Sequence, residues 1–143
     1  MKTQSGFTLI ELMMALVVVA ILTAIALPSY TAYIIRGKIP DATANLSNKQ
    51  VQMEQWFQDN RTYIGAPACN DLTPPNKNFQ FSCPVLTATT YTLQADGKAS
   101  MAGFTYTVDQ SGAKTSTFAS PAPAAWIASS PAACWITKAG DTC

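Results

Sequence analysis

One acidic residue stands alone in the apolar N-terminal part of this chain. Residues 7–27 read FTLIELMMALVVVAILTAIAL, and Glu11 is the single charged residue among them. An acid inside a membrane helix costs about 2.5–3.5 kcal/mol on insertion scales, so its presence indicates a function and a cationic partner. As a helix, this segment would be about 31 Å long, which matches the hydrocarbon core of a bilayer.

The other side chains offer little that could carry catalysis. The 143 residues include no histidine, four cysteines, nine Lys+Arg and eight Asp+Glu. The lack of histidine removes the usual catalytic triads and imidazole metal sites, which need a group that titrates near neutral pH. The cysteines lack C-x-x-C spacing, which argues against a redox pair or a zinc site. Four scattered aspartates, Asp71, Asp96, Asp109 and Asp141, are each near an expected turn, so we predict no metal, no cofactor and no enzymatic activity.

The residues around Glu11 carry a more specific pattern. Residues 1–6 (MKTQSG) followed by residues 7–12 (FTLIEL) resemble the leader and cleavage site of type IV pilins. The resemblance implies that a prepilin peptidase cleaves between Gly6 and Phe7 and methylates the new amine of Phe7. With a reference pKa of about 7.7–8.0, that amine is largely cationic at neutral pH. Glu11 of one subunit can neutralise the Phe7 amine of another, so we expect Glu11 to favour assembly and to fix its axial register.

Two other interpretations of the apolar segment stay open. A cleaved secretory signal peptide would use the small-x-small pattern at residues 24–26, although residues 7–27 exceed the usual 7–15 apolar residues and contain a carboxylate. A plain membrane anchor would leave Glu11 without a partner.

A second, amphipathic helical segment is predicted after the apolar one. Apolar residues recur at steps of three and four along one face of it: Ile35, Ile39, Ala42, Leu46, Gln50, Met53 and Phe57, with Gln50 the one polar member. Its polar sides are expected to carry Asn45, Asn48, Lys49 and Gln52. Pro28 should kink or loosen the helix, as the resemblance also implies, and Gly37 and Pro40 mark a second weak point. The helix should end near Asp59 and Asn60.

The remainder of the chain alternates like a small antiparallel sheet. Polar and apolar residues alternate over 78–83, 91–95 and 104–108, and a fourth strand is an option at 114–118. Short turns at Asp96-Gly97 and Ser111-Gly112 predict a meander, with one face packed on the apolar stripe of residues 35–57. Residues 116–133, rich in Ala, Ser and Pro, are expected to form an extended surface loop.

These elements predict an α+β fold with a long N-terminal helix packed on a sheet of three or four strands. We expect a leader at 1–6, a transmembrane and polymerisation helix at 7–27, an amphipathic helix at 28–59 and a globular head at 60–143. Four cysteines allow three pairings, which the sequence does not decide. We favour Cys69–Cys83 and Cys134–Cys143, because local pairs close short loops worth up to about 3 kcal/mol each. The last pair also resembles the disulfide-bounded C-terminal loop of type IV pilins.

The resemblance implies a structural subunit of a type IV pilus that serves adhesion, twitching motility or DNA uptake. It would begin as a single-pass protein of the bacterial inner membrane, with its leader in the cytoplasm and its head in the periplasm, and end in the extracellular fibre. The implied partners are other pilin subunits, the inner membrane, the prepilin peptidase and the pilus assembly machinery.

Two alternatives remain for the function. Residues 53–63 resemble minor pilins and the competence pilins of DNA uptake, which makes DNA a further candidate partner. Trp126 and Trp135 near Lys138 could stack bases if exposed, although such tryptophans more often cover a small core. The near-zero net charge of +1 gives DNA binding little electrostatic support. The second alternative is a pseudopilin of the type II secretion system.

Overall fold

The computed structural model describes residues 6–70 and 77–143, with the backbone alone at residues 27 and 28. Most of the expected leader, residues 1–5, and the candidate acid Asp71 lie outside the described residues. By its internal contacts the chain divides into two units, residues 1–34 and residues 35–143.

Helix α1 (Leu9–Asn60) is the longest element of the chain. It continues without interruption through Pro28, Gly37 and Pro40, and the weak points that we expect there stay predictions. Its N-terminal part is long and apolar enough to cross a membrane, and none of that apolar stretch is buried within the structure. Arg61 ends the helix with a positive φ of 56°, and its N–H donates to the carbonyl of Phe57 at 2.8 Å.

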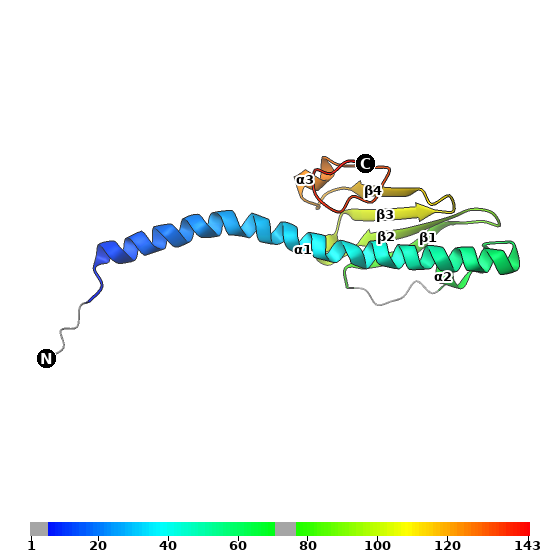
Figure 1. The fold of residues 1–143 in the computed structure, drawn as a ribbon, viewed down its shortest axis with the longest axis horizontal. Helices are drawn as coiled ribbons and strands as arrows, with labels where there is room; N and C mark the ends of the chain where they lie inside the picture. The colour runs from blue at the N-terminus through cyan, green and yellow to red at the C-terminus, as the bar shows by residue number, and fades with distance from the viewer. Residues whose placement is uncertain (1–5, 71–76) are drawn as a thin grey trace. The chain divides into compact units, whose positions relative to one another are not determined.

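The head contains a four-stranded antiparallel sheet, β1 (Phe79–Leu86), β2 (Tyr91–Gly97), β3 (Phe104–Asp109) and β4 (Lys114–Phe118), in sequence order. The predicted meander is thus confirmed, and the optional fourth strand is present. The register places Phe79 opposite Gly97 and Tyr106 opposite Ser116. Figure 1 shows the part of α1 that follows residue 34 running along one face of this sheet.

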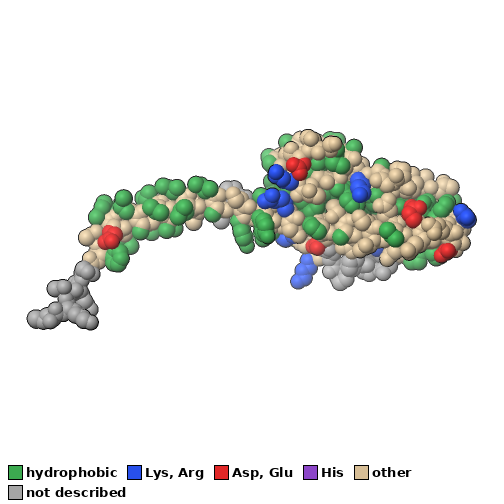
Figure 2. Space-filling view, in the orientation of Figure 1, with side chains coloured by type: hydrophobic (Ala, Val, Ile, Leu, Met, Phe, Trp, Pro, Cys, Tyr) green, Lys and Arg blue, Asp and Glu red, His purple; other side chains and the backbone are tan. Residues whose placement is uncertain are grey.

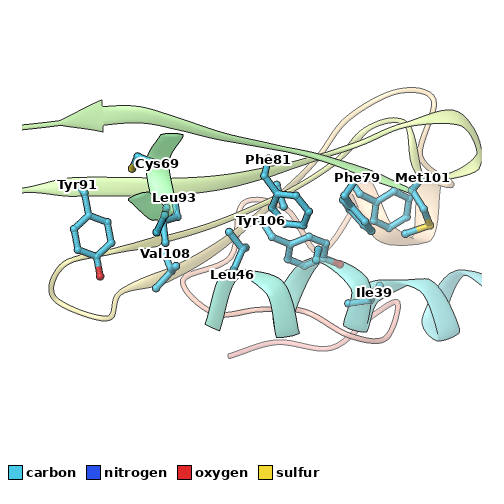
Figure 3. Close-up of a cluster of buried hydrophobic side chains, with 14 of the residues drawn as sticks. Ile39, Leu46, Cys69, Phe79, Phe81, Tyr91, Leu93, Met101, Tyr106 and Val108 are labelled. Atoms are coloured by element: carbon cyan, nitrogen blue, oxygen red, sulfur yellow. The ribbon is translucent and has the colours of Figure 1, made fainter. Parts of the chain in front are cut away.

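The core lies between the apolar stripe of α1 and the facing side chains of the sheet (Figure 3). The stripe contributes Ile39, Ala42, Leu46 and Met53, each at most 1% exposed. Our assignment of Lys49 to a polar side of the helix is wrong, because this side chain is buried. Its Nζ donates to the carbonyl of Ala68 at 3.2 Å, so the aliphatic part of the side chain is buried while the ammonium group has a polar partner.

Two disulfides tie the head together. Cys69, in the short helix α2 (Pro67–Asn70), is bonded to Cys83 in β1, and Cys134 is bonded to the C-terminal Cys143. The first disulfide joins the segment after α1 to the first strand. The second closes the C-terminal loop, whose Ile136 is buried and accepts a hydrogen bond from the hydroxyl of Tyr106.

The expectation of an extended surface loop at residues 116–133 is wrong. Ser116 and Ala132 exchange two backbone hydrogen bonds, and residues in between form the short helix α3 (Ala124–Ile127). Trp126 of this helix is 2% exposed and packs edge-on against the rings of Phe104 and Phe118. Burial of these three aromatic rings outweighs the loop-forming composition of the segment.

Candidate functional site

The start of α1 is built as a capped helix terminus that holds Glu11 in its first turn. The hydroxyl of Thr8 accepts a hydrogen bond from the N–H of Glu11 at 3.3 Å, and the carbonyl of Thr8 accepts one from Leu12. Thr8 is therefore the N-cap, and Glu11 occupies the third helical position of a T-x-x-E capping box. Sequence reasoning singled out Glu11 but missed Thr8, although the T-x-x-E pattern was available in the printed sequence. A carboxylate here is also favoured by the helix dipole.

The apolar side chains around this terminus are uncovered. Phe7 is 84% exposed, and every large apolar side chain from there to Ile25 is at least 53% exposed. Soluble monomers rarely expose a continuous apolar surface larger than a few hundred Å². The residues that follow Glu11 thus form a surface suited to lipid or to other apolar helices.

Another carboxylate of α1, Glu54, has a structural role. It accepts hydrogen bonds from the hydroxyls of Tyr63, at 3.1 Å, and Tyr91, at 2.9 Å. Burial, and then the hydrogen bond and charge of Glu54, raise the pKa of both tyrosines above the usual value. Both phenols therefore stay protonated near neutral pH and act as donors. Tyr91 joins the end of α1 to β2, and Tyr63 joins it to the segment that follows the helix.

The two tryptophans that could stack bases if exposed are differently placed. Trp126 is buried in the core and is not available to a base. Trp135 is half-buried, its Nε1 donates to the carbonyl of Thr107 at 2.8 Å, and the Nζ of Lys114 lies 4.4 Å from its ring centroid. The cation beside an aromatic ring in this part of the head is thus Lys114, which the sequence did not single out.

Four basic residues gather at the end of the head where β1 begins and β2 ends. Lys38 of α1 donates from Nζ to the hydroxyl of Ser100 at 2.6 Å. The N–H of Lys98 donates to the carbonyl of Asn78 at 2.7 Å, which brings Lys98 beside Lys77 at neighbouring strand ends. Arg36 lies two residues before Lys38 in α1. Arg36 and the three lysines are named the basic cluster (Arg36, Lys38, Lys77 and Lys98). Figure 2 shows blue side chains collected at this end of the head.

Among residues 6–70 and 77–143, no three or more carboxylates and cysteines lie close enough together to hold a metal ion. A shallow depression of about 400 Å³ has only amide, carboxylate, indole and aliphatic groups in its lining: Gln52, Gln55, Trp56, Asp59, Pro67 and Ala68. This lining provides no nucleophile paired with a base.

Two family models match adjoining parts of the chain. Residues 1–27 match the prokaryotic N-terminal methylation motif, and residues 28–105, more than half of the chain, match the family described as type IV minor pilin ComP, DNA uptake sequence receptor.

Fimbrial proteins of several bacteria match part of the chain. A fimbrial protein of Moraxella nonliquefaciens is 52% identical over 42 residues, which are 29% of this chain and 27% of the relative. A fimbrial protein of Pseudomonas aeruginosa is 34% identical over 71 residues, 50% of this chain and 46% of the relative. The type IV major fimbrial protein FimA of Dichelobacter nodosus is 34% identical over 70 residues, 48% of this chain and 43% of the relative. The chain thus spans less than half of the length of these relatives.

The fold is similar to that of the non-core minor pilin PilV of Neisseria meningitidis. The TM-score is 0.56 at 18% sequence identity, and the match covers 64% of this chain and 94% of the solved chain. At this identity the comparison shows a common fold: a helix packed on an antiparallel sheet.

Proposed function

Since this chain belongs to the family of type IV minor pilins described by ComP, the DNA uptake sequence receptor, we propose that it is a structural subunit of a type IV pilus. The observation that carries this role is an apolar helical surface, at least 53% exposed at each large side chain, with the single carboxylate of Glu11 in its capped first turn. Such a surface is suited to a membrane first and to neighbouring helices afterwards. The role is structural rather than catalytic, in keeping with the fimbrial names of the relatives.

The proposed processing begins in the inner membrane. A prepilin peptidase cleaves between Gly6 and Phe7 and methylates the amine of Phe7, as the match of residues 1–27 to the methylation motif supports. The leader then lies in the cytoplasm, residues 7–27 span the bilayer, and the head of residues 60–143 faces the periplasm. The two disulfides support this side for the head, because the periplasm is oxidising.

Assembly follows from the electrostatics of the new N-terminus. The cationic amine of Phe7 and the carboxylate of Glu11 are each costly in hydrocarbon, and pairing them between neighbouring subunits removes both costs. The partners are therefore other pilin subunits and the assembly machinery that lifts them from the membrane. If the proposal holds, mild shearing of cells recovers this protein with pili; its confinement to membranes with no trace in fibres would contradict it. A type II secretion pseudopilin would behave in this second way.

A second candidate function is binding of DNA at the pilus surface. It is favoured by the match of residues 28–105 to the ComP family, whose description names a receptor of the DNA uptake sequence. Binding would rest on exposed lysines of the head, with Trp126 excluded as a stacking residue by its burial.

A gel-shift titration of the full chain in detergent tests DNA binding. We expect duplex DNA to be retarded, with an affinity that falls about 40-fold between 50 and 200 mM salt if about three phosphates are contacted. A duplex of unrelated sequence is the matched control for sequence preference. If micromolar protein retards no duplex even at the lower salt concentration, the chain is not a DNA receptor on its own.

A further inference from the structure

The basic cluster combines residues that are far apart in the sequence. Lys38 and its partner Ser100 are 62 residues apart, and the β1–β2 register places Lys77 and Lys98 just beyond the same end of the sheet. Arg36, Lys77 and Lys98 are exposed, and Lys38 is half-buried.

Among the residues that the structure describes, two acidic side chains lie near the cluster and are already engaged. Asp41 accepts a hydrogen bond from the amide of Asn78, and Asp96 accepts hydrogen bonds from Gln94 and Thr105. Four basic and two acidic groups leave an excess of positive charge at this end of the head. In the rest of the described unit of residues 35–143, the basic and the acidic groups are equal in number: Lys49, Arg61, Lys114 and Lys138 against Glu54, Asp59, Asp109 and Asp141.

The short distance in sequence between the apolar segment and Arg36 suggests that the basic cluster lies near a membrane surface. Arg36 follows the last residue of the apolar segment, Leu27, by nine residues, which as helix are about 14 Å long. The headgroup layer extends about 5–8 Å beyond the hydrocarbon, and charges act over a Debye length of about 8 Å at physiological salt. Long lysine and arginine side chains shorten the remaining gap further. A protein anchored by residues 7–27 thus carries Arg36 within electrostatic reach of lipid phosphates.

We propose that the basic cluster binds the phosphate groups of anionic phospholipids in the membrane that anchors the chain, and so holds the head against that membrane before assembly. The proposal rests on the membrane insertion proposed above. Juxtamembrane lysines and arginines each contribute about fivefold to the affinity for an anionic lipid surface. Because lysine ammonium groups act as point charges, the cluster recognises headgroup charge rather than one headgroup structure. Extraction of the subunit into a fibre would then have to break these contacts.

The test uses the full chain in lipid nanodiscs and measures backbone hydrogen exchange. One disc type contains only zwitterionic phosphatidylcholine, and the other contains about one-third anionic phosphatidylglycerol, so that surface charge is the variable. We expect exchange in residues 77–80 and 96–101 to be at least about threefold slower in anionic discs. Raising the salt to about 0.5 M, where the Debye length is about 4 Å, should remove this difference.

The variants Lys77→Glu/Lys98→Glu and Lys114→Glu/Lys138→Glu change the net charge equally at different places on the head. The first should abolish the lipid-dependent slowing, and the second should retain it. Lys77→Gln/Lys98→Gln, which only neutralises the charge, should reduce the slowing with less risk to the fold.

Protection of residues 9–27 in both disc types reports membrane insertion separately, so loss of that protection contradicts the proposed function rather than the lipid contact. With insertion intact, equal exchange in the two disc types overturns the proposal. Slowing by added duplex DNA but not by anionic lipid also overturns it and assigns the cluster to nucleic acid.

Discussion

Glu11→Val is expected to lower the recovery of this chain in sheared fibres by about 10-fold or more, while its amount in the inner membrane stays unchanged. The substitution removes the only charge in residues 7–27, so insertion becomes no harder. In the fibre, however, the amine of Phe7 then lies among apolar helices without a counter-charge. Removing one partner of such a pair costs several kcal/mol, because the other charge remains. Immunoblots of the sheared and membrane fractions measure both quantities.

Two matched variants separate the capping role of Glu11 from the role of its charge in assembly. Glu11→Gln keeps a side chain that suits the third position of the capping box but lacks the charge. It should therefore fail in assembly nearly as Glu11→Val does. Thr8→Ala removes the hydroxyl that accepts the N–H of Glu11 but keeps the carboxylate, so it should assemble nearly normally. Normal fibres from Glu11→Gln together with poor fibres from Thr8→Ala would assign Glu11 to helix capping instead.

Gly103→Ala is expected to destabilise the head by about 2–4 kcal/mol, which lowers Tm by about 10–20 °C. Gly103 has a φ of +87°, and a Cβ at this position would lie 2.1 Å from the carbonyl oxygen of Ala119 and 2.8 Å from the N–H nitrogen of Ala122. Its own carbonyl also accepts a hydrogen bond from Ala119 at 2.9 Å. The added methyl group must therefore push apart two backbone segments. Thermal unfolding of the full chain in detergent, followed by near-UV circular dichroism, measures the loss.

Gly140→Ala is the matched control for the backbone strain. Its φ of +81° is nearly the same, but a Cβ there meets nothing within 4 Å among the described residues. Only the conformational strain of about 1 kcal/mol should appear, with a Tm shift of a few degrees. Equal and small shifts for both variants would show that residues 119–122 do not pack against Gly103.

The helix and the sheet could be predicted because their periodicities report burial directly. The steps of three and four between Ile39, Ala42 and Leu46, and the alternation in β1 to β3, appear in the structure as one shared core. The helical period predicts only the side of the helix from which Lys49 extends. The burial of this side chain depends on the carbonyl of Ala68, 19 residues later, which accepts its hydrogen bond. Ala, Ser and Pro around Trp126 predict a loop, whereas the aromatic partners that bury this side chain lie on β3 and β4.

The candidate site divides in the same way. Gly6, Phe7 and Glu11 are neighbours in the sequence, so their pattern could be read without a fold, and the T-x-x-E cap of Thr8 could have been read with them. The basic cluster could not be predicted, because Lys38 and Lys98 are brought together only by the packing of α1 and the register of β1 with β2. The contact between Lys114 and the ring of Trp135 could not be predicted either, because β4 and the disulfide-closed C-terminal loop come together only in the fold.

The mass of the mature N-terminal peptide tests the proposed processing most directly. Protein recovered from membranes or fibres is digested, and its first peptide is identified by mass spectrometry. The proposal predicts a chain that begins at Phe7 and carries one methyl group on its amine, with Gly6 absent. A chain that begins at Leu27, after the small-x-small pattern of residues 24–26, would contradict it and identify residues 1–26 as a secretory signal peptide.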